Sequence, residues 1–311
     1  MRYGEINDFY FLYGFDAKTH KECKGYIQHC DFRHKRTVKN SKPFNELCIL
    51  RDKEYFSIFG QAYNLPVLKT VGIFENGMIY GNTGKEDILS YLFSSVCHSL
   101  FFKPLNDECG AGIFSLNKKN NKWIINDKDE YDEHSIKCFF LNLKKQKYIV
   151  QSRLEQCEDM NRLYPKSINT IRIITIRDKA GVPQFFHSLL RIGAGGNVVD
   201  NWAKGGIVVG IDKDGFLSKW GYFKPPYGKK TINHPDTNVV FEGFRIPCYK
   251  EAIDVCLSYH QRLKNVYAIG WDVAITKDGP MLIEGNDNFE ISLHQAVDRG
   301  LKKEINNWLV K

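Results

Sequence analysis

The amino-acid sequence predicts an α/β protein in which helices and antiparallel β-sheets build separate α+β lobes. Several segments alternate apolar and polar residues with the two-residue period of a β-strand, and short turns join neighbouring strands. Other segments repeat their apolar residues every three or four positions, as amphipathic helices do. The 311 residues are enough for one large domain or two to three lobes, and the 14% aromatic content argues against disorder.

The first third of the chain is predicted as a cap that leads into helices and a strand. Residues 1 to about 45 are rich in Lys, His and Cys and have poor periodicity, so we expect an irregular or partly helical cap. Residues 46–63 have the apolar spacing of one helix, which the Asn-Leu-Pro sequence at 64–66 ends. Residues 67–74 follow as a strand, and residues 83–87 are expected to begin the next helix.

A lysine and two glycines in the next segment predict a phosphate-binding loop. Residues 99–104 are predicted as a strand that contains Lys103, and Gly110 and Gly112 follow before a hairpin at 113–125. Glycines let backbone N–H groups approach phosphate oxygens, and a lysine supplies positive charge. No Gly-Lys-Ser or Gly-Lys-Thr sequence follows, so this is not a Walker loop. The alternative is an ordinary glycine-rich β-turn beside a lysine.

The middle of the chain is predicted as one helix and a run of strands. The helix covers 131–143, and the strands cover 148–154, 167–177, 183–192, 207–211 and 216–219. A glycine-rich loop occupies 193–206. Asn169 and Arg172 are polar within an otherwise apolar strand, which fits either a functional site or an exposed sheet face.

Acidic residues in a C-terminal hairpin predict a metal site. The hairpin covers 269–286, between predicted helices at 248–263 and 291–309. Asp272 lies within an apolar strand, Glu284 ends the return strand, and Asn286 follows on the same face as Glu284. A buried carboxylate is unfavourable unless it is paired or bound to a cation, and hard oxygen donors suit Mg²⁺. The alternative is a hairpin whose acids simply reach solvent.

Composition and charge favour anionic small-molecule partners. The formal net charge is +8, and such a balance attracts nucleotides or acidic sugars. No recognition motif for nucleic acid is visible, so we expect no nucleic-acid partner. The nine cysteines lack metal-site spacing, which favours reduced thiols in a cytoplasm. We expect neither a signal peptide nor a transmembrane segment, because no apolar run is long enough.

Motifs in a fixed order make the sequence resemble the ATP-grasp superfamily. The motifs are Lys103-Pro104, Gly110-Ala111-Gly112, Gln151-Ser152-Arg153-Leu154, Asn169-Thr170-Ile171-Arg172, Arg191, Asn201-Trp202-Ala203-Lys204-Gly205-Gly206, Asp272 and Glu284-Gly285-Asn286. The segments at 167–172, 199–207 and 270–276 look like the branch called sugar-transfer-associated ATP-grasp, which is found among bacterial surface-polysaccharide genes. The resemblance covers about residues 45–295.

The resemblance implies an ATP-grasp fold, with two lobes that hold ATP between them and an N-terminal cap region. It implies a cap and lead-in at 1–95, a small lobe with the glycine flap at 96–160, and a large lobe with the Mg²⁺ site at 161–311. The residues that would contact ATP are Lys103, Gly110, Gly112, Gln151, Ser152, Arg153, Leu154, Asn169 and Arg172. The residues that would hold Mg²⁺ are Asp272, Glu284 and Asn286. The residues that would act in catalysis are Lys103, Arg191 and Asn201.

The activity that the resemblance implies is ATP-dependent ligation of a carboxylate to an amine through an acyl phosphate. The substrates would be small molecules, an acidic sugar or an amino acid on the carboxylate side, and the setting would be cytoplasmic synthesis of bacterial surface polysaccharide. An association with glycosyltransferase machinery belongs to the same expectation. Two alternatives stay open: a sugar or polyol kinase on the same fold, and a nucleotide-binding scaffold without turnover.

Overall fold

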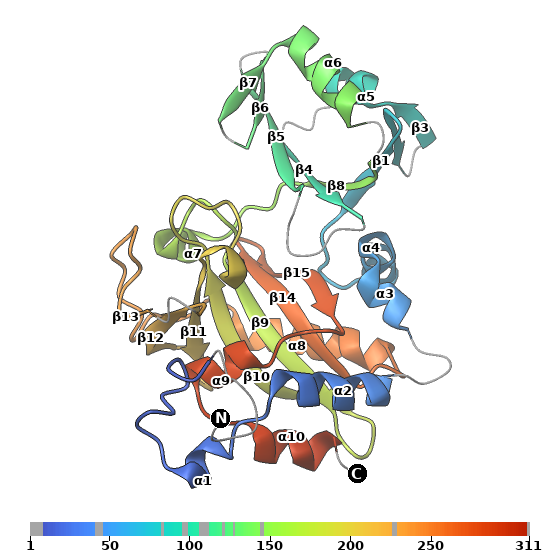
Figure 1. Ribbon diagram of the computed structural model, residues 1–311. Coiled ribbons are helices and arrows are strands. Elements are labelled where there is room, and N and C mark those ends of the chain that lie inside the picture. Colours follow the sequence, from blue (N-terminus) through green and yellow to red (C-terminus); the bar gives the residue numbers. More distant parts are fainter. Residues whose placement is uncertain are drawn as a thin grey trace. The chain divides into compact units, whose positions relative to one another are not determined.

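The chain divides into two compact units. The computed structural model of the chain describes residues 9–40, 46–81, 84–94, 99–105, 112–119, 122–126, 128–143, 146–225 and 229–309. Unit 1 comprises Met1–Arg51 and Gln156–Lys311, and unit 2 comprises Asp52–Glu155 (Figure 1). The boundaries predicted from sequence motifs fall after residues 95 and 160, whereas compactness divides the chain after residues 51 and 155.

Unit 2 is built on an eight-stranded antiparallel sheet in the order β3-β2-β1-β8-β4-β5-β6-β7. The strands are β1 (Thr70–Glu75), β2 (Met78–Gly81), β3 (Gly84–Asp87), β4 (Ser99–Pro104), β5 (Phe114–Lys119), β6 (Lys122–Ile125), β7 (Asp129–Tyr131) and β8 (Tyr148–Ser152). The helices are α4 (Lys53–Ala62), α5 (Ile88–Ser94) and α6 (Glu133–Asn142). The helix expected to begin at 83–87 begins instead at Ile88, because β3 pairs with β2 over that stretch.

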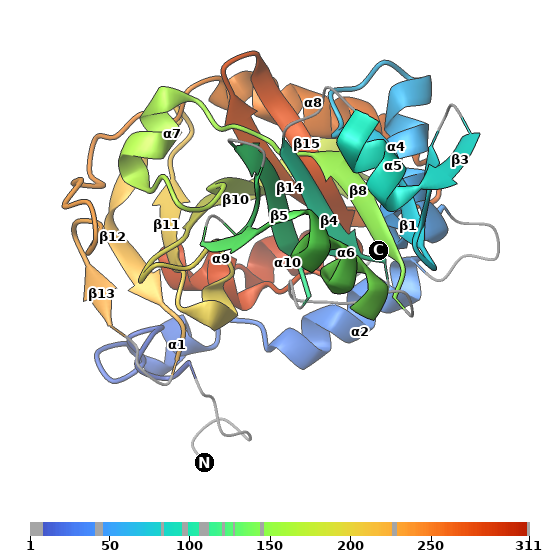
Figure 2. The ribbon, with the colours of Figure 1, turned by 90° about the horizontal axis from the view of Figure 1, so that it is seen from above.

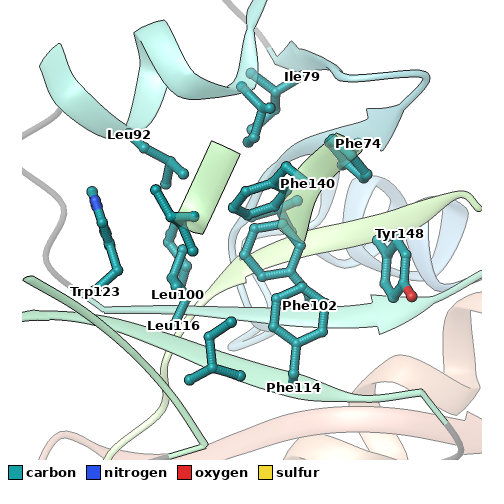
Figure 3. Packing of buried hydrophobic residues seen from close by; sticks show 14 residues of the cluster. Phe74, Ile79, Leu92, Leu100, Phe102, Phe114, Leu116, Trp123, Phe140 and Tyr148 are labelled. Carbon is teal, nitrogen blue, oxygen red and sulfur yellow. The ribbon is translucent and has the colours of Figure 1, made fainter. Parts of the chain in front are cut away.

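An aromatic core fills one face of the unit 2 sheet. Phe102 and Phe114 stack with their ring centroids 4.5 Å apart, and Phe140 of α6 packs against them (Figure 3). The inward-facing residues of β4, Leu100 and Phe102, alternate with Phe101 and Lys103. Alternation along a strand therefore directs Lys103 to the face of the sheet opposite the aromatic core.

Unit 1 is built on a seven-stranded antiparallel sheet in the order β13-β12-β11-β10-β9-β14-β15, with β12 and β13 at one edge (Figure 2). The strands are β9 (Thr170–Arg177), β10 (Pro183–Ile192), β11 (Ile207–Ile211), β12 (Leu217–Phe223), β13 (Lys230–Thr231), β14 (Ala268–Thr276) and β15 (Gly279–Asn286). The helices are α1 (His20–Cys23), α2 (His29–Asn40), α3 (Leu47–Arg51), α7 (Glu158–Leu163), α8 (Tyr249–Arg262), α9 (Ser292–Val297) and α10 (Lys302–Leu309), with a 3-10 turn η1 (Trp202–Lys204).

Helices cover both faces of the unit 1 sheet. On one face α8 contacts the central strands, and a hydrogen-bonded chain runs from Trp271 of β14 through Thr175 of β9 to His260 of α8. On the other face, α2 and α10 pack against Ile174 and Ile176 of β9. Arg172 lies two residues from Ile174, so Arg172 shares the α2 face of the sheet.

The N-terminal cap is an integral part of unit 1. Arg36 of α2 is buried between the rings of Phe32 and Phe289, at 5.3 and 5.1 Å from their centroids. It donates to the backbone oxygen of Phe289 at 2.6 Å and to the side chain of Asn288 at 2.5 Å. These contacts fix the loop that follows β15. Burial lowers the pKa of Arg36 to about 10, so the guanidinium keeps its charge at neutral pH.

Two segments predicted as single helices are each divided. In 46–63 the break falls at Asp52, whose carboxylate accepts from the backbone N–H groups of Glu54 and Tyr55 and so begins a new helix. In 291–309 the break falls before α10, where Gly300 lies so close to Gly25 that a Cβ on residue 300 would be 2.5 Å from the Gly25 backbone. Among the described residues no helix is long and apolar enough to cross a membrane.

Candidate functional site

The hairpin β14–β15 brings together the three residues predicted to bind a metal ion. Asp272 is paired directly with Glu284, and Gly270 with Asn286. Directly opposed residues in an antiparallel pair project from the same face. The Asn286 amide nitrogen donates to the Glu284 carboxylate at 3.2 Å, which leaves the amide oxygen as the atom that Asn286 can offer to a cation. A β-bulge between Asp272 and Val273 lies beside the pair.

Asp272 is buried and bound by two arginines. Arg172, its direct partner on β9, donates through Nε to Oδ1 at 2.5 Å and through a terminal nitrogen to Oδ2 at 2.9 Å. Arg191 of β10 donates to the same Oδ2 at 3.0 Å. Burial alone would raise the pKa of Asp272, but Arg172 and Arg191 lower it to about 2. Asp272 is therefore a carboxylate at neutral pH.

A second buried carboxylate, Asp200, holds the other end of Arg191. Its Oδ1 accepts from Arg191 at 2.8 Å. Its Oδ2 accepts from the backbone N–H of Thr170 at 3.1 Å and also from the Thr170 hydroxyl. Burial disfavours the charged form of Arg191, but Asp200, Asp272 and Glu284 outweigh burial and raise its pKa. The pKa of Asp200 is raised by burial, although Arg191 opposes that effect.

The residues at this site fit a magnesium ion in donor chemistry. Two carboxylates and an amide oxygen are the hard ligands that Mg²⁺ accepts alongside water and phosphate oxygens. No cluster of three His, Cys, Asp or Glu side chains that could hold a metal lies within the residues that the structure describes. The arginines compete with a metal ion for Asp272, because both of its carboxylate oxygens already accept from arginine N–H groups.

The loop after β10 contains a tight turn that presents Asp200. Asn201, a predicted catalytic residue, caps η1 by accepting from the backbone N–H of Ala203 at 2.9 Å. Gly205 has φ +91°, which favours glycine. A Cβ on Gly206 would lie 2.6 Å from the Asp200 backbone oxygen, so only glycine fits. The Asn201–Gly206 motif therefore shapes the turn after Asp200, in addition to the catalytic role predicted for Asn201.

Asn169 is bonded entirely within the protein. Its amide nitrogen donates to the backbone oxygens of Met160 and Tyr164, both at 2.9 Å, and its oxygen accepts from the backbone N–H of Gly193 at 3.3 Å. Its own backbone N–H donates to Gln156. These contacts tie β9 to the segment before it. The predicted contact between Asn169 and a nucleotide stays a prediction.

In unit 2, the residues predicted to contact a nucleotide lie on two paired strands. Lys103 of β4 pairs with Ile149 of β8, and Phe101 with Gln151, so the four residues share one face. The Lys103 ammonium lies 5.6 Å from the ring centroid of Phe101. Gln151 is buried, and no described residue donates to its Oε1. A buried acceptor without a partner is unfavourable, and a ligand N–H group would satisfy it.

The other predicted hinge and flap residues are less constrained. Ser152 is exposed and ends β8, and Arg153 and Leu154 follow it as half-buried residues. Gly112 has φ +67°, as expected for a turn glycine. Gly110 lies outside the described residues.

Sequence reasoning missed Asp200 and Thr170 as members of the site. Asp200 directly precedes the Asn201–Gly206 motif, and Thr170 lies between Asn169 and Arg172. The available signal was an acidic residue in a glycine-rich loop that follows a strand ending in Arg191-Ile192. Nothing local in the sequence connects the two segments.

A cavity elsewhere in unit 1 includes none of these residues. Its volume is about 440 Å³, and Lys39, Arg177, Lys264, Tyr267 and Trp308 are among its lining residues. Arg177 is bound to the backbone oxygens of the chain around it, so its role there is structural.

Comparison with known proteins identifies one family over most of the chain. The model of the family described as sugar-transfer associated ATP-grasp matches residues 33–308. No curated protein matches the chain. Among solved structures, the ADP complex of N5-carboxyaminoimidazole ribonucleotide synthetase shares 13% identity, with 86% of this chain and 53% of that chain covered and a TM-score of 0.49.

Two further solved structures are similar at the same level. The D-alanine–D-alanine ligase from Bacillus anthracis has 12% identity, with 84% of this chain and 66% of that chain covered and a TM-score of 0.46. The ATP-grasp ligase PsnB, complexed with a variant of its minimal precursor, Mg and ADP, has 11% identity, coverage of 85% and 59%, and a TM-score of 0.46. The chain spans about half the length of the first solved structure.

Proposed function

Because this chain belongs to the sugar-transfer associated ATP-grasp family, we propose that it is an ATP-dependent ligase that joins a carboxylate to an amine. The family match confirms the resemblance predicted from the sequence, and with it the ATP-grasp fold of mixed helices and sheets. The carboxylate, the amine and the setting in surface-polysaccharide synthesis remain proposals, as do a cytoplasmic location and an association with glycosyltransferase machinery.

The observation that carries the proposal is the pairing of Asp272 with Glu284 beside two arginines. The two carboxylates and Asn286 lie on one face of a hairpin, and Arg172 and Arg191 lie next to them on the neighbouring strands. Metal ligands and cations close together are what phosphoryl transfer requires, because the reaction depends on positioning and on neutralising phosphate charge. Mg²⁺, when bound by Asp272, Glu284 and Asn286, would supply charge neutralisation for the phosphate oxygens.

The proposed reaction has two steps. The substrate carboxylate attacks the γ-phosphorus of ATP, which forms an acyl phosphate as the bond to the β-phosphate oxygen breaks and ADP leaves. The amine then attacks the acyl carbon, and phosphate leaves as the amide forms and the amine loses a proton. Arg191 stabilises the charge on the transferring phosphoryl group, and Asn201 holds the reacting carboxylate.

Residues of unit 2 have their own part in this proposal. Lys103 contacts the ATP phosphates through its ammonium group, and Gly110 and Gly112 allow backbone N–H groups to approach them. Gln151 accepts a hydrogen bond from the nucleotide base, which is supported by its buried Oε1, to which no described residue donates. Ser152, Arg153 and Leu154 would complete the same contact region.

Hydroxylamine trapping tests the reaction and separates it from the alternatives. The protein is incubated with Mg-ATP, hydroxylamine and single carboxylates drawn from uronic acids and amino acids. A ligase forms a hydroxamate together with equal amounts of ADP and free phosphate. A kinase forms ADP and a phosphorylated acceptor without hydroxamate. Nucleotide binding without ADP formation on any carboxylate would contradict the ligase and favour the scaffold.

A further inference from the structure

Four charged side chains form a buried row of alternating sign in unit 1. The order is Asp200, Arg191, Asp272 and Arg172, and the closest N–O distances between successive members are 2.8, 3.0 and 2.5 Å. Each side chain is at most 13% exposed. Buried charges are tolerated only when they are paired in this way.

Arg191 is the member of the row that has two carboxylate partners. One terminal nitrogen donates to Asp272 and the other donates to Asp200. Asp200 is fixed independently, because its second oxygen accepts from Thr170, the direct strand partner of Arg191. The backbone of Asp200 is close to that of Gly206, since a Cβ on residue 206 would lie 2.6 Å from the Asp200 backbone oxygen.

Oδ2 of Asp272 must change partners before that oxygen can bind a cation. This Oδ2 accepts from both arginines, so both lone pairs of that oxygen are in use. A metal ion at this oxygen would also repel the guanidinium groups. If Arg191 released Asp272 with no second partner, a buried cation would be left unpaired, which is strongly unfavourable. Asp200 removes that difficulty, because Arg191 keeps one carboxylate partner throughout.

We propose that Asp200 is a positioning residue that holds Arg191 when Arg191 exchanges Asp272 for a phosphate oxygen of the substrate. In this account Asp200 acts on the metal site only through Arg191. Oδ2 of Asp272, which still accepts from Arg172, then has a lone pair for the cation, while the released N–H group of Arg191 faces the phosphate. The inference rests on the proposed function, because it needs a metal ion and a phosphate at this site.

A double-mutant cycle on metal affinity tests the proposal without any knowledge of the carboxylate or amine. Mn²⁺ binding is measured by electron paramagnetic resonance on the full chain, with and without ADP, for wild type, Asp200→Asn, Arg191→Gln and the double variant. The double variant removes both members of the ion pair, so it leaves no unpaired buried charge from that pair. Far-ultraviolet circular dichroism checks that each variant is folded. Asp212→Asn is the matched control, because Asp212 also accepts from backbone N–H groups of its own loop, those of Asp214 and Phe216.

The expected result is coupling between the two positions. Asp200→Asn alone lowers Mn²⁺ affinity by about tenfold, because Arg191 then relies on Asp272. In the Arg191→Gln background, Asp200→Asn changes the affinity by less than about twofold. An equal loss of Mn²⁺ affinity in both backgrounds would mean that Asp200 acts by its charge alone, and it would overturn the inference. The proposed function would still stand in that case, because wild type binds Mn²⁺. No Mn²⁺ binding by wild type, with or without ADP, would contradict the proposed function and the inference together.

Discussion

Arg172 and Asp272 face each other across neighbouring strands and are joined by two hydrogen bonds of 2.5 and 2.9 Å. On the other side of Asp272, the direct strand partner is Glu284. Arg172, Asp272 and Glu284 therefore lie directly opposite one another across β9, β14 and β15. This arrangement explains how an acidic residue can stay ionised in a buried strand before any metal ion binds.

Replacing Asp272 should destabilise the protein even without a metal ion. Asp272→Asn leaves Arg172 without its carboxylate partner in a buried position, and the expected loss is about 3–5 kcal/mol of unfolding free energy. Urea denaturation in the presence of a chelator measures it. The double variant Asp272→Asn with Arg172→Gln should recover part of the loss, because it also removes the unpaired cation. Wild-type stability for the single variant would contradict the ion-pair account.

Two buried glutamines should respond in opposite ways to the same substitution. Gln151→Met removes the Oε1 that has no described partner, so unfolding free energy should rise by about 1 kcal/mol while ATP affinity falls. Gln156→Met removes hydrogen bonds to Tyr164, Ser167 and Asn169, so stability should fall by about 2 kcal/mol or more. Urea denaturation and nucleotide titration measure the two effects. Equal destabilisation by both substitutions would show that the Oε1 of Gln151 already accepts a hydrogen bond in the protein without nucleotide.

Stability should decline as pH falls below about 6.5, and His260 is one cause. His260 is buried and neutral: its Nε2 donates to the Val266 backbone oxygen and its Nδ1 accepts from the Thr175 hydroxyl, which itself accepts from Trp271. Burial, with a smaller effect of Arg177, lowers its pKa to about 3. The unfolded chain, with a pKa near 6.5, therefore binds the extra proton between about pH 6.5 and 3.

The sign of that effect follows from proton binding. The stabilisation is complete above about pH 6.5 and is lost toward pH 3, at a limit of about 1.4 kcal/mol per pH unit for this one group. His260→Gln should reduce the slope of unfolding free energy against pH between 6.5 and 5 by up to that amount. His134→Gln, on the exposed side of α6, is the surface control. An unchanged slope in His260→Gln would show that His260 is not the group responsible.

The start of α4 depends on one carboxylate. Asp52 accepts from the backbone N–H groups of Glu54 and Tyr55 at 2.8 and 3.0 Å. Asp52→Ala should cost about 1 kcal/mol of unfolding free energy, because both N–H groups lose their acceptor. Asp52→Asn keeps an acceptor oxygen and should cost less. Thermal denaturation of the two variants measures the difference, and equal losses would point to the charge rather than the cap.

Local patterns in the sequence predicted most of the strands but not the contacts between distant ones. The alternation in β4, β10 and the β14–β15 hairpin was sufficient to locate them, and Glu284 and Asn286 share a face as their spacing implied. The register of the hairpin places Asp272 on the same face. The helix breaks were missed for two reasons. Asp52 begins a new helix as its N-cap, but the sequence around Asp52 is equally compatible with the interior of one continuous helix. Gly300 is required by its contact with Gly25, which is far away in the chain.

Local sequence patterns could not predict the row of ion pairs either, because its members are far apart in the chain. Arg172 and Asp272 are 100 positions apart, and their partnership depends on the register of β9 against β14. Asp200 is linked to Thr170 over 30 positions. Motif resemblance could select Arg172, Arg191 and Asp272 as functional residues, but it could not show that they bind one another.

The most direct test of the account is the thermal stability of wild type and Glu284→Gln with ATP, with and without Mg²⁺. For wild type we predict a rise in melting temperature with ATP that Mg²⁺ enlarges, because a ligand at about 100 times its Kd stabilises by about 2.7 kcal/mol. Glu284→Gln should lose the Mg²⁺-dependent part, whereas Glu304→Gln, at a half-buried position of α10 where the carboxylate pairs with Arg299, should keep it. No shift of wild type with any nucleotide, or a full Mg²⁺-dependent rise in Glu284→Gln, would contradict a nucleotide and metal site at this hairpin.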